Sequence, residues 1–262
     1  MKIATWNVNS VKARLEAVLH WMQEASPDVA GLQEIKCVDE AFPRLEFESL
    51  GYNLITHGQK TYNGVALLSK HPIEDVTRGL PGLEDIQSRY IEALITPKGR
   101  APVRVVCIYL PNGNPAPGEK YDYKLRWMAA LEARVAALLA QEERLIVMGD
   151  YNVIPEPKDV HNPAAWAKDA LFLPETRAAF RRLEYLGLTD AVKACNALPG
   201  MYTFWDYQAG AWPKNNGIRI DHLMLSPEAA NRLTSASVEK HVRAWEKPSD
   251  HVPVAIELSI DA

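Results

Sequence analysis

Short apolar segments that alternate with amphipathic segments constrain this chain of 262 residues more than any other feature. The apolar segments are rich in Val, Ile and Leu and have the length of single β-strands. They occupy residues 2–6, 29–33, 64–69, 90–95, 103–110, 144–149, 218–225 and 253–258. The pattern predicts layers of helix and sheet, an α/β fold. Because no segment has the composition of a linker, we expect a single domain over residues 1–262.

Three amphipathic segments are predicted to be helices whose apolar faces pack on a sheet. The first covers residues 11–22, with Ser10 in the N-cap position. The second has its apolar face within residues 128–139, and the third follows Pro174. We expect the inward face of the third helix to hold Phe180, Leu183 and Leu186.

Composition excludes several classes of protein. With 29 basic and 33 acidic residues, the formal net charge is −4, so the chain does not coat nucleic acid through net positive charge. A local basic groove remains compatible with this charge. No apolar stretch approaches the length of a membrane span, and the N-terminus lacks the features of a signal peptide. We therefore expect no membrane association and a cytoplasmic protein, nucleoid-associated if it is bacterial.

The three cysteines are too few for a disulfide scaffold. Cys37, Cys107 and Cys195 also match no zinc-binding spacing. Cys107 lies in an apolar run and is expected to be a buried thiol. This cysteine usage indicates a reducing compartment.

Polar residues gather where the predicted strands end, which is where open α/β sheets hold their ligands. Taken one at a time, each is typical of a turn. Together they offer carboxylates, amides and one histidine at the same topological position. Oxygen-rich sets of this kind suit Mg²⁺ rather than zinc. The residues are Asn7, Asn9, Gln33, Glu34, Tyr109, Asn112, Asp150, Asn152, Asp221, Asp250 and His251.

An ordered series of short motifs resembles the exonuclease III family of apurinic/apyrimidinic endonucleases, within the DNase I-like endonuclease/exonuclease/phosphatase superfamily. Each motif is weak alone, but together they keep the family's order over nearly the whole chain. The motifs are Thr5-Trp6-Asn7-Val8-Asn9, Gln33-Glu34, Gly64-Val65-Ala66-Leu67-Leu68-Ser69, Tyr109-Leu110-Pro111-Asn112, Gly149-Asp150-Tyr151-Asn152, Arg219-Ile220-Asp221-His222 and Ser249-Asp250-His251.

The resemblance implies a four-layer α/β sandwich, in which two facing mixed β-sheets are flanked by helices. A faint similarity between residues 2–7 and 144–152, both strands ending in Asn, agrees with two related halves. The implied activity is that of a Mg²⁺-dependent DNA repair nuclease, with Mn²⁺ able to substitute. It would act as a monomer on double-stranded DNA with abasic sites or 3′ ends, by 5′ incision, 3′-to-5′ exonuclease action or 3′-end trimming.

The resemblance also implies roles for individual residues. Glu34 would bind the metal with Asn7 and Asp250, and a second metal has been proposed beside Asp150, Asn152 and His251. The number of metals stays open, as does the choice of Asp150 or His251 as general base. Asp221 would orient His251. Tyr109 would donate to the phosphate, or act as a phenolate if its pKa is depressed, and Asn112 and Asn152 would hydrogen-bond the phosphate or the water.

A segment dense in aromatics, residues 202–207, indicates the substrate. It resembles the family segment that forms the pocket for a flipped-out abasic sugar. An apolar pocket of Phe204, Ile218 and Ile220 would favour a sugar without a base, because extruding it costs least. Asn9, Trp205 and Trp212 are further expected substrate contacts, with Trp212 a candidate wedge into the duplex. His161 lies in a second loop expected either to shape the site or to be exposed.

Two other functions remain open at this point. A phosphatase of the same superfamily, acting on a small phosphorylated or lipid substrate, would share Glu34, Asp150, Asn152 and His251. It would not be expected to share residues 109–112 or the aromatic segment. A catalytically inactive DNA-binding relative would have no physical need for four converging carboxylates.

Overall fold

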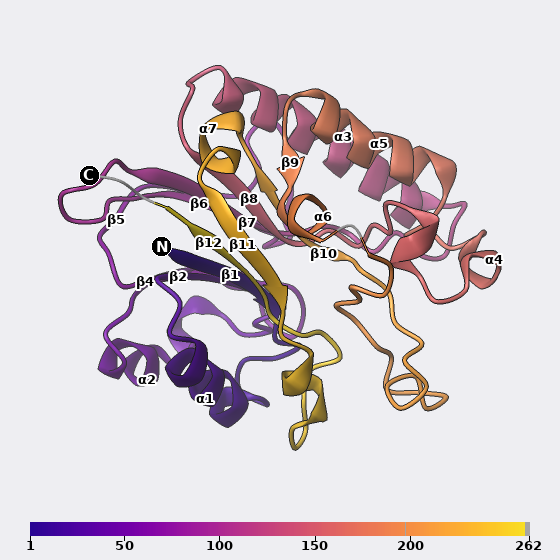
Figure 1. Ribbon diagram of the computed structural model, residues 1–262, viewed down its shortest axis with the longest axis horizontal. Coiled ribbons are helices and arrows are strands. Elements are labelled where there is room, and N and C mark those ends of the chain that lie inside the picture. Colours follow the sequence, from indigo (N-terminus) through magenta and orange to yellow (C-terminus); the bar gives the residue numbers. More distant parts are fainter. Residues whose placement is uncertain (197, 260–262) are drawn as a thin grey trace.

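Two six-stranded sheets form the centre of the molecule (Figure 1). The computed structural model describes residues 1–196 and 198–259. In strand order, the first sheet contains β11 (Leu233–Val238), β12 (Val254–Leu258), β1 (Lys2–Asn7), β2 (Val29–Gln33), β4 (Val65–Ser69) and β3 (Asn53–His57). The second contains β5 (Ile73–Arg78), β6 (Tyr90–Ile95), β7 (Val103–Tyr109), β8 (Leu145–Asp150), β10 (Asp221–Leu225) and β9 (Thr189–Asp190).

The two sheets share one strand pattern, which agrees with the faint sequence similarity between residues 2–7 and 144–152. β1 and β2 are parallel, and β12 and β4 flank them antiparallel. In the same way β7 and β8 are parallel, flanked antiparallel by β6 and β10. Both sheets are therefore mixed, as expected.

The core lies between the sheets and is made by the inward faces of their central strands. Ile3, Val29 and Leu67 of the first sheet pack with Val105 and Ile146 of the second, and all five are fully buried. Helices cover the outer faces, so the central strands are buried on both sides. Burial on both faces explains why their sequences are continuous apolar runs rather than alternating ones.

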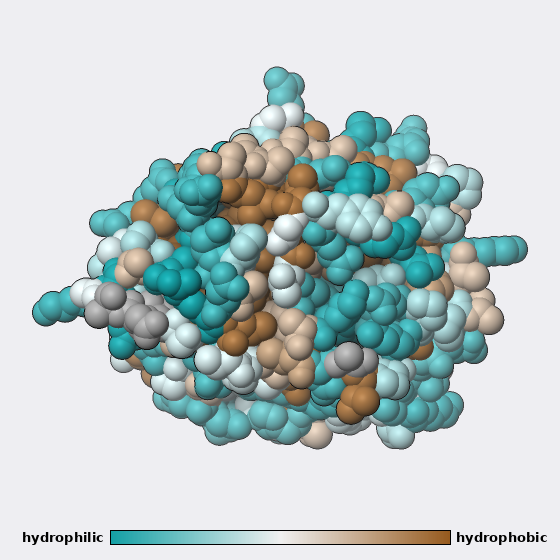
Figure 2. Space-filling model, turned by 45° about the horizontal axis from the view of Figure 1, so that its top comes forward, coloured by the Kyte–Doolittle hydropathy of each residue, from teal (hydrophilic) through white to brown (hydrophobic). Residues whose placement is uncertain are grey.

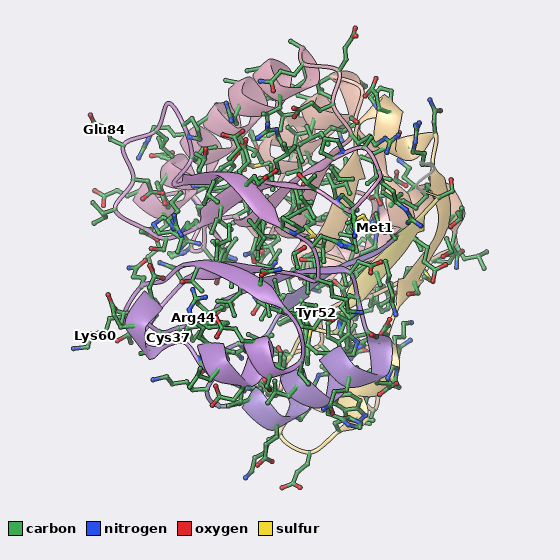
Figure 3. The ribbon with its side chains drawn as sticks, turned by 90° about the vertical axis from the view of Figure 1, so that its left-hand side faces the viewer. Met1, Cys37, Arg44, Tyr52, Lys60 and Glu84 are labelled. Atoms are coloured by element: carbon green, nitrogen blue, oxygen red, sulfur yellow. The ribbon has the colours of Figure 1, made fainter. Side chains whose placement is uncertain are left out.

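Helices complete the outer two of the four layers, seen edge-on in Figure 3. α1 and α2 lie outside the first sheet, and α3 and α5 lie side by side outside the second (Figure 1). The α-helices are α1 (Leu15–Ala25), α2 (Arg44–Ser49), α3 (Glu119–Leu139), α4 (Pro163–Trp166), α5 (Pro174–Tyr185), α6 (Ala191–Cys195) and α7 (Pro227–Ala230). Three 3₁₀ turns are η1 (Asp39–Ala41), η2 (Pro157–Asp159) and η3 (Lys240–Ala244).

The first helix begins later than expected, and Ser10 is not its N-cap. Arg14 occupies that position, while the Ser10 hydroxyl accepts from the Ala13 amide in a preceding turn. The Ser10 amide donates to the Glu34 carbonyl, which ties this segment to the end of β2 and holds it out of the helix.

Two other boundaries differ from expectation. Leu186 does not face the core: it follows the last residue of α5 and is 37% exposed. The strand expected over 218–225 begins at Asp221, because Ile218 instead forms bridges with Val160 and Phe204.

The surface in Figure 2 is mostly hydrophilic, with smaller hydrophobic areas between the polar groups. Across the described residues, no helix combines the length and the apolar character that a membrane crossing requires.

Candidate active site

The strand pairing brings the predicted site residues to one edge of the two sheets. Tyr109 and Asp150 are register partners at the carboxyl ends of β7 and β8. Asp221 starts the antiparallel strand β10 and pairs directly with Asp150. Asn7 ends β1 in the facing sheet, and Glu34 follows β2. Residues far apart in the sequence therefore meet at the edge where the two sheets face each other.

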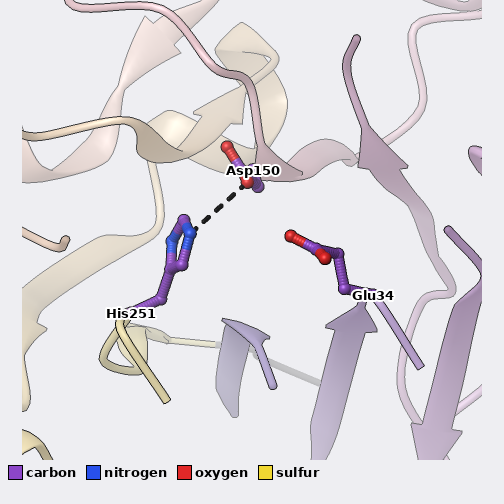
Figure 4. A group of neighbouring side chains, drawn as sticks. All are labelled: Glu34, Asp150 and His251. Carbon is purple, nitrogen blue, oxygen red and sulfur yellow. Dashed lines mark ion pairs between the residues drawn. The ribbon is translucent and has the colours of Figure 1, made fainter. Parts of the chain in front are cut away.

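Glu34, Asp150 and His251 converge at the centre of this edge (Figure 4). One ligand-type atom from each lies within 4.8 Å of the others. Nε2 of His251 is 3.7 Å from Oδ2 of Asp150. Asp150 and His251 are buried, and Glu34 is partly exposed. The cluster can therefore be reached from solvent through the Glu34 side.

Asn7 links the two carboxylates of this cluster. Its side-chain amide donates to Oε1 of Glu34 at 2.8 Å and to Oδ2 of Asp150 at 2.9 Å. Its Oδ1 accepts from the Asn9 amide at 3.0 Å. The amide nitrogen thus faces the cluster, and Asn7 orients the two carboxylates here. Its expected role as a metal ligand stays a prediction.

His251 is held by a buried carboxylate on the opposite side of its ring. Nδ1 of His251 lies 2.8 Å from Oδ2 of Asp221, and the Thr203 hydroxyl donates to that same oxygen at 2.6 Å. Asp221 is fully buried. This partner fixes the tautomer of the imidazole and leaves Nε2 facing Asp150.

Burial and charge set the proton affinities of the cluster. Burial favours neutral His251, but the charges of Asp221 and Asp150 prevail and raise its pKa to about 10. Burial raises the pKa of Asp150 well above its usual range, and the charge of His251 opposes this only in part. Against burial, the Asn7 hydrogen bond and the charge of Lys36 hold the pKa of Glu34 below its ordinary value.

Tyr109 is a phenol and not a phenolate. Burial raises its pKa well above 10, and the charges of Glu34 and Asp150 act in the same direction. The guanidinium of Arg89 lies 4.8 Å from the centre of its ring and does not reverse the shift. The phenolate role is therefore not supported, while the role of a hydrogen-bond donor is.

Two asparagines form the polar rim beside Asp150. The Asn112 amide donates to Oδ1 of Asn152 at 3.1 Å, and the Asn152 side chain donates to the Leu110 carbonyl at 2.9 Å. The backbone amide of Asn152 donates to Oδ1 of Asp150 at 2.9 Å. Asn152 has a φ of 47°, a left-handed conformation that asparagine tolerates better than most residues.

A cavity of about 280 Å³ opens beside the cluster and is polar on one side and apolar on the other. The expected pocket residues Phe204, Ile218 and Ile220 line its apolar side, together with two that the sequence did not indicate, Trp166 and Leu171. Phe204 also packs edge-on against the His251 ring, with ring centres 4.9 Å apart. The apolar wall therefore adjoins the proposed catalytic groups.

Asp250 and Asn9 lie at the edge of this site, outside the three-residue cluster. Asp250 lines the cavity, and its Oδ1 accepts from the Asn9 side chain at 3.1 Å. Asn9 also accepts from the Lys36 ammonium at 2.5 Å.

Other residues expected at the site do not line the cavity. Trp205 is fully buried, and its indole donates to Asn215. Trp212 is partly buried edge-on against Trp205, with ring centres 4.9 Å apart, so its ring does not project as a wedge. His161 is exposed and lies near the Gly217 carbonyl.

Two lysines at the site were missed. The ammonium of Lys36 lies 2.9 Å from Oε2 of Glu34, and the wholly buried Lys124 donates to the carbonyls of Asn112 and Asn152. Lys36 stands two residues after Glu34 and could have been considered on proximity alone. Lys124 lies within a long amphipathic helix, and nothing in its local sequence separates it from a surface lysine.

The donor set fits a hard divalent cation. Two carboxylates and an imidazole offer ligand atoms within 4.8 Å of one another, at a place where Asp150 and His251 are buried. Carboxylate-rich sites suit Mg²⁺ and Mn²⁺. The structure thus offers a metal-binding group at Glu34, Asp150 and His251.

Comparison with known proteins agrees with this geometry. A model described as the Endonuclease/Exonuclease/phosphatase family matches residues 4–251. The chain belongs to this family. Exodeoxyribonuclease III of Haemophilus influenzae is 37% identical, over 98% of this chain and 100% of its own. These family members and the motif order together confirm the resemblance found in the sequence.

Solved structures of the family share the whole fold. The structure of the 3′ phosphatase NExo from Neisseria bound to a product DNA hairpin has a TM-score of 0.95 and 36% identity, and covers 99% of each chain. An AP endonuclease from Archaeoglobus fulgidus has a TM-score of 0.94 and 34% identity, again over 99% of each chain. The expected four-layer sandwich of the DNase I-like class is therefore confirmed.

Proposed function

We propose that this protein is a Mg²⁺-dependent DNA repair nuclease that cuts double-stranded DNA on the 5′ side of abasic sites and trims 3′ ends. The observation that carries the proposal is the apolar wall directly beside the carboxylate–histidine cluster. Phe204 contributes to that wall and also contacts the His251 ring. A hydrolytic centre placed against a small apolar pocket suits a sugar that has lost its base.

The size and lining of the cavity support this substrate. At about 280 Å³, the cavity can take a deoxyribose, and Trp166, Leu171 and Ile218 give it an apolar side against which the sugar can pack. Extruding a nucleotide costs a few kcal/mol and least when there is no base to unstack. The pocket would thus favour abasic sugars and frayed 3′ ends over paired nucleotides.

Basic residues in two other surface hollows support a DNA partner despite the net charge. Arg89 and Lys120 line a neighbouring hollow of about 370 Å³, which shares Asn112 with the site. Lys12, Arg14 and Lys247 line another of about 390 Å³. Lysine and arginine side chains in such places bind backbone phosphates without reading sequence.

Glu34 would hold the metal, with Asp250 at the edge of the site, and Asp150 and His251 face it from the other side of the cluster. When bound, Mg²⁺ or Mn²⁺ supplies positive charge to the phosphate oxygens and to the leaving oxygen. The rest of the chemistry falls to the protein's own groups.

Asp150 is the better general base of the two candidates. Burial raises its pKa toward neutrality, which is what a base for water requires. His251, with a pKa of about 10, is already protonated at neutral pH and is suited to donate from Nε2 to a phosphate oxygen. Asp150 would take a proton from water, whose oxygen attacks phosphorus as the P–O3′ bond breaks, and the released O3′ would take a proton from solvent to become a 3′-hydroxyl.

Three neutral donors around the cluster would hold the phosphate. The Tyr109 phenol stays protonated, and Asn112 and Asn152 present side-chain amides at the rim. Donors fixed in place before the reaction stabilise the charge that develops on the phosphate oxygens.

Labelled duplexes test the proposal. One carries a single abasic site, one a 3′-phosphate end, and one is undamaged and blunt; each is incubated with Mg²⁺ or with EDTA. We expect incision at the abasic site and removal of the 3′ phosphate with Mg²⁺, slower loss from the blunt ends, and no product with EDTA. An Ile218→Asn variant, which makes the pocket wall polar, should lose abasic incision more than 3′-phosphate removal.

Other outcomes would contradict the proposal. Equal cutting of abasic and intact DNA at internal positions would contradict the proposed role of the pocket in selecting abasic sugars. Hydrolysis of inositol phosphates without any nicking of DNA would favour the small-molecule phosphatase. Binding without cutting would favour an inactive relative. We also propose that the protein acts as a monomer.

A further inference from the structure

Lys124 is a buried lysine that the proposed mechanism leaves without a role. It lies in the second turn of α3, and its side chain is wholly buried. Long charged side chains are almost never fully buried unless they are paired or hydrogen-bonded. Its surroundings must therefore compensate the ammonium.

The compensation comes from two backbone carbonyls at the active site. Nζ of Lys124 donates to the Asn152 carbonyl at 2.6 Å and to the Asn112 carbonyl at 2.9 Å. These two residues belong to separate loops, one after β7 and one after β8. A single side chain therefore ties both loops to one helix.

The aliphatic stem of the Lys124 side chain is packed as closely as its terminal nitrogen. A Cβ placed on Gly113 would lie 2.6 Å from Cδ of Lys124, and the φ of Gly113 is +89°. Only glycine takes that conformation readily and leaves this space free. The turn after Asn112 thus passes directly over the lysine stem, and neither can shift without the other.

The helix that carries Lys124 is a rigid support. Trp127, Met128 and Leu131 of α3 are buried in the outer core of the second sheet, where they pack with Phe180 of α5. The position of the ammonium is therefore set by the sheet and its helices and not by the loops that it contacts.

From the two carbonyls, hydrogen bonds continue to the reacting groups. The side chains of Asn112 and Asn152 bond to each other at 3.1 Å, and the Asn152 amide bonds to Oδ1 of Asp150 at 2.9 Å. The left-handed φ of Asn152 needs such support. Releasing the two carbonyls would let both side-chain amides and the Asp150 carboxylate move.

We propose that Lys124 is a positioning residue, which fixes the Asn112 and Asn152 loops so that their amides and Asp150 are aligned on the scissile phosphate. This inference rests on the proposed nuclease function. Lys124 would act through its two hydrogen bonds to backbone, without contact with the DNA. Because an amine and an ammonium can both donate two hydrogen bonds, the proposal does not depend on the protonation of Lys124.

The test compares variants on the abasic duplex with saturating Mg²⁺. Lys124→Met keeps the stem and removes the donors; we expect kcat to fall by about 100-fold, as for small misplacements of reacting groups, with KM for DNA nearly unchanged. Lys124→Arg restores donors and should return kcat to within about 10-fold of wild type. Arg134→Met, in the same helix, removes an ion pair with buried Glu92, where the atoms are 2.7 Å apart, and serves as the stability control.

Arg134→Met should lower the unfolding temperature and leave kcat unchanged below that temperature. The proposal is overturned if Lys124→Met keeps wild-type kcat, or if its loss equals that of Arg134→Met at the same folded fraction. If Lys124→Met does not fold, Lys124→Gln is measured instead, with the same expected loss and the same overturning results. Failure of the wild type to cut would contradict the proposed function and not this role of Lys124.

Discussion

At the scale of single residues, the site is a place where like charges are forced together. Asp150 and Asp221 stand opposite each other on neighbouring strands, and both are buried. Like charges directly opposite in a sheet are destabilising. His251 relieves the repulsion, with one ring nitrogen 2.8 Å from Asp221 and the other 3.7 Å from Asp150.

This arrangement predicts an unusual pH dependence of stability for the protein without metal. Both Asp150 and His251 have folded-state pKa values above their unfolded values, so each holds its proton more tightly when folded. Their contribution to stability is complete below the unfolded pKa and is lost as the pH rises through the folded pKa. We expect the unfolding temperature in EDTA to fall between about pH 4 and about pH 10, and less steeply in Asp150→Asn.

Mg²⁺ should make the fall shallower, because a cation stabilises the charged form of Asp150. Thermal unfolding followed by circular dichroism over this pH range checks both statements. If the unfolding temperature of wild type and of Asp150→Asn changed with pH in parallel, with and without Mg²⁺, the raised pKa assigned to Asp150 would be contradicted.

The sequence predicted which residue types meet at the site because each lies at or beside the end of a recognisable strand. Lys36, two residues after Glu34, was missed although it lies near a strand end. Lys124 and Trp166 could not be predicted, because they lie away from the strand ends and reach the site through tertiary packing. It also overstated Trp205 and Trp212, whose rings pack on each other. An aromatic cluster in sequence does not reveal which of its rings faces a cavity.

At the scale of elements, a buried ionic network holds the apolar wall of the cavity. Arg219 lies between Ile218 and Ile220, and its guanidinium contacts Asp159 of η2 at 2.8 Å and Asp190 of β9 at 2.7 Å. Arg219 is 2% exposed. It therefore fixes the segment before β10 against two other elements.

Removing the Arg219 guanidinium should lower both the stability of the fold and the preference for abasic DNA. Arg219→Met leaves two buried carboxylates without their partner, which typically costs about 3–5 kcal/mol. We expect a lower denaturation midpoint in urea. At temperatures where the variant is folded, we expect the rate of abasic-site incision to fall more than the rate of 3′-phosphate removal. Arg182→Met, which removes an exposed pair with Glu132, is the control and should change neither. Equal losses of rate on the two substrates would contradict the role of this ionic network in holding the pocket wall.

The strands that the sequence predicted are the buried central ones. β1, β2, β4, β6, β7, β8, β10 and β12 each carry an apolar run that only a sheet interior explains. β3, β5 and β11 were missed because they are edge strands in which many side chains are exposed or only partly buried. β9 is two residues long and exists only through its pairing with β10.

At the scale of the whole molecule, the net charge has a local origin. Glu34, Asp150, Asp221 and Asp250 lie together at the site, and without them the acidic residues equal the 29 basic residues in number. A bound divalent cation would offset much of this charge. The acidic composition is thus compatible with a nucleic-acid substrate.

The flanking basic residues should govern DNA affinity and not the chemistry. Lys12 and Lys247 are exposed in one hollow beside the site. We expect Lys12→Glu with Lys247→Glu to raise KM for an abasic duplex by about 10-fold or more, with kcat nearly unchanged, and to reduce the salt dependence of binding. Steady-state kinetics at several salt concentrations would show this; an unchanged KM would place the DNA elsewhere.

The account depends most directly on Glu34, Asp150 and His251 acting as one metal-dependent hydrolytic centre. The measurement is the rate of incision of a labelled abasic duplex with Mg²⁺ by wild type, Glu34→Ala and His251→Ala, each first shown to be folded by circular dichroism. We predict cutting by wild type that EDTA abolishes, and loss of at least about 1,000-fold in each variant. Wild-type rates in either folded variant, or cutting that persists in EDTA, would contradict the central claim.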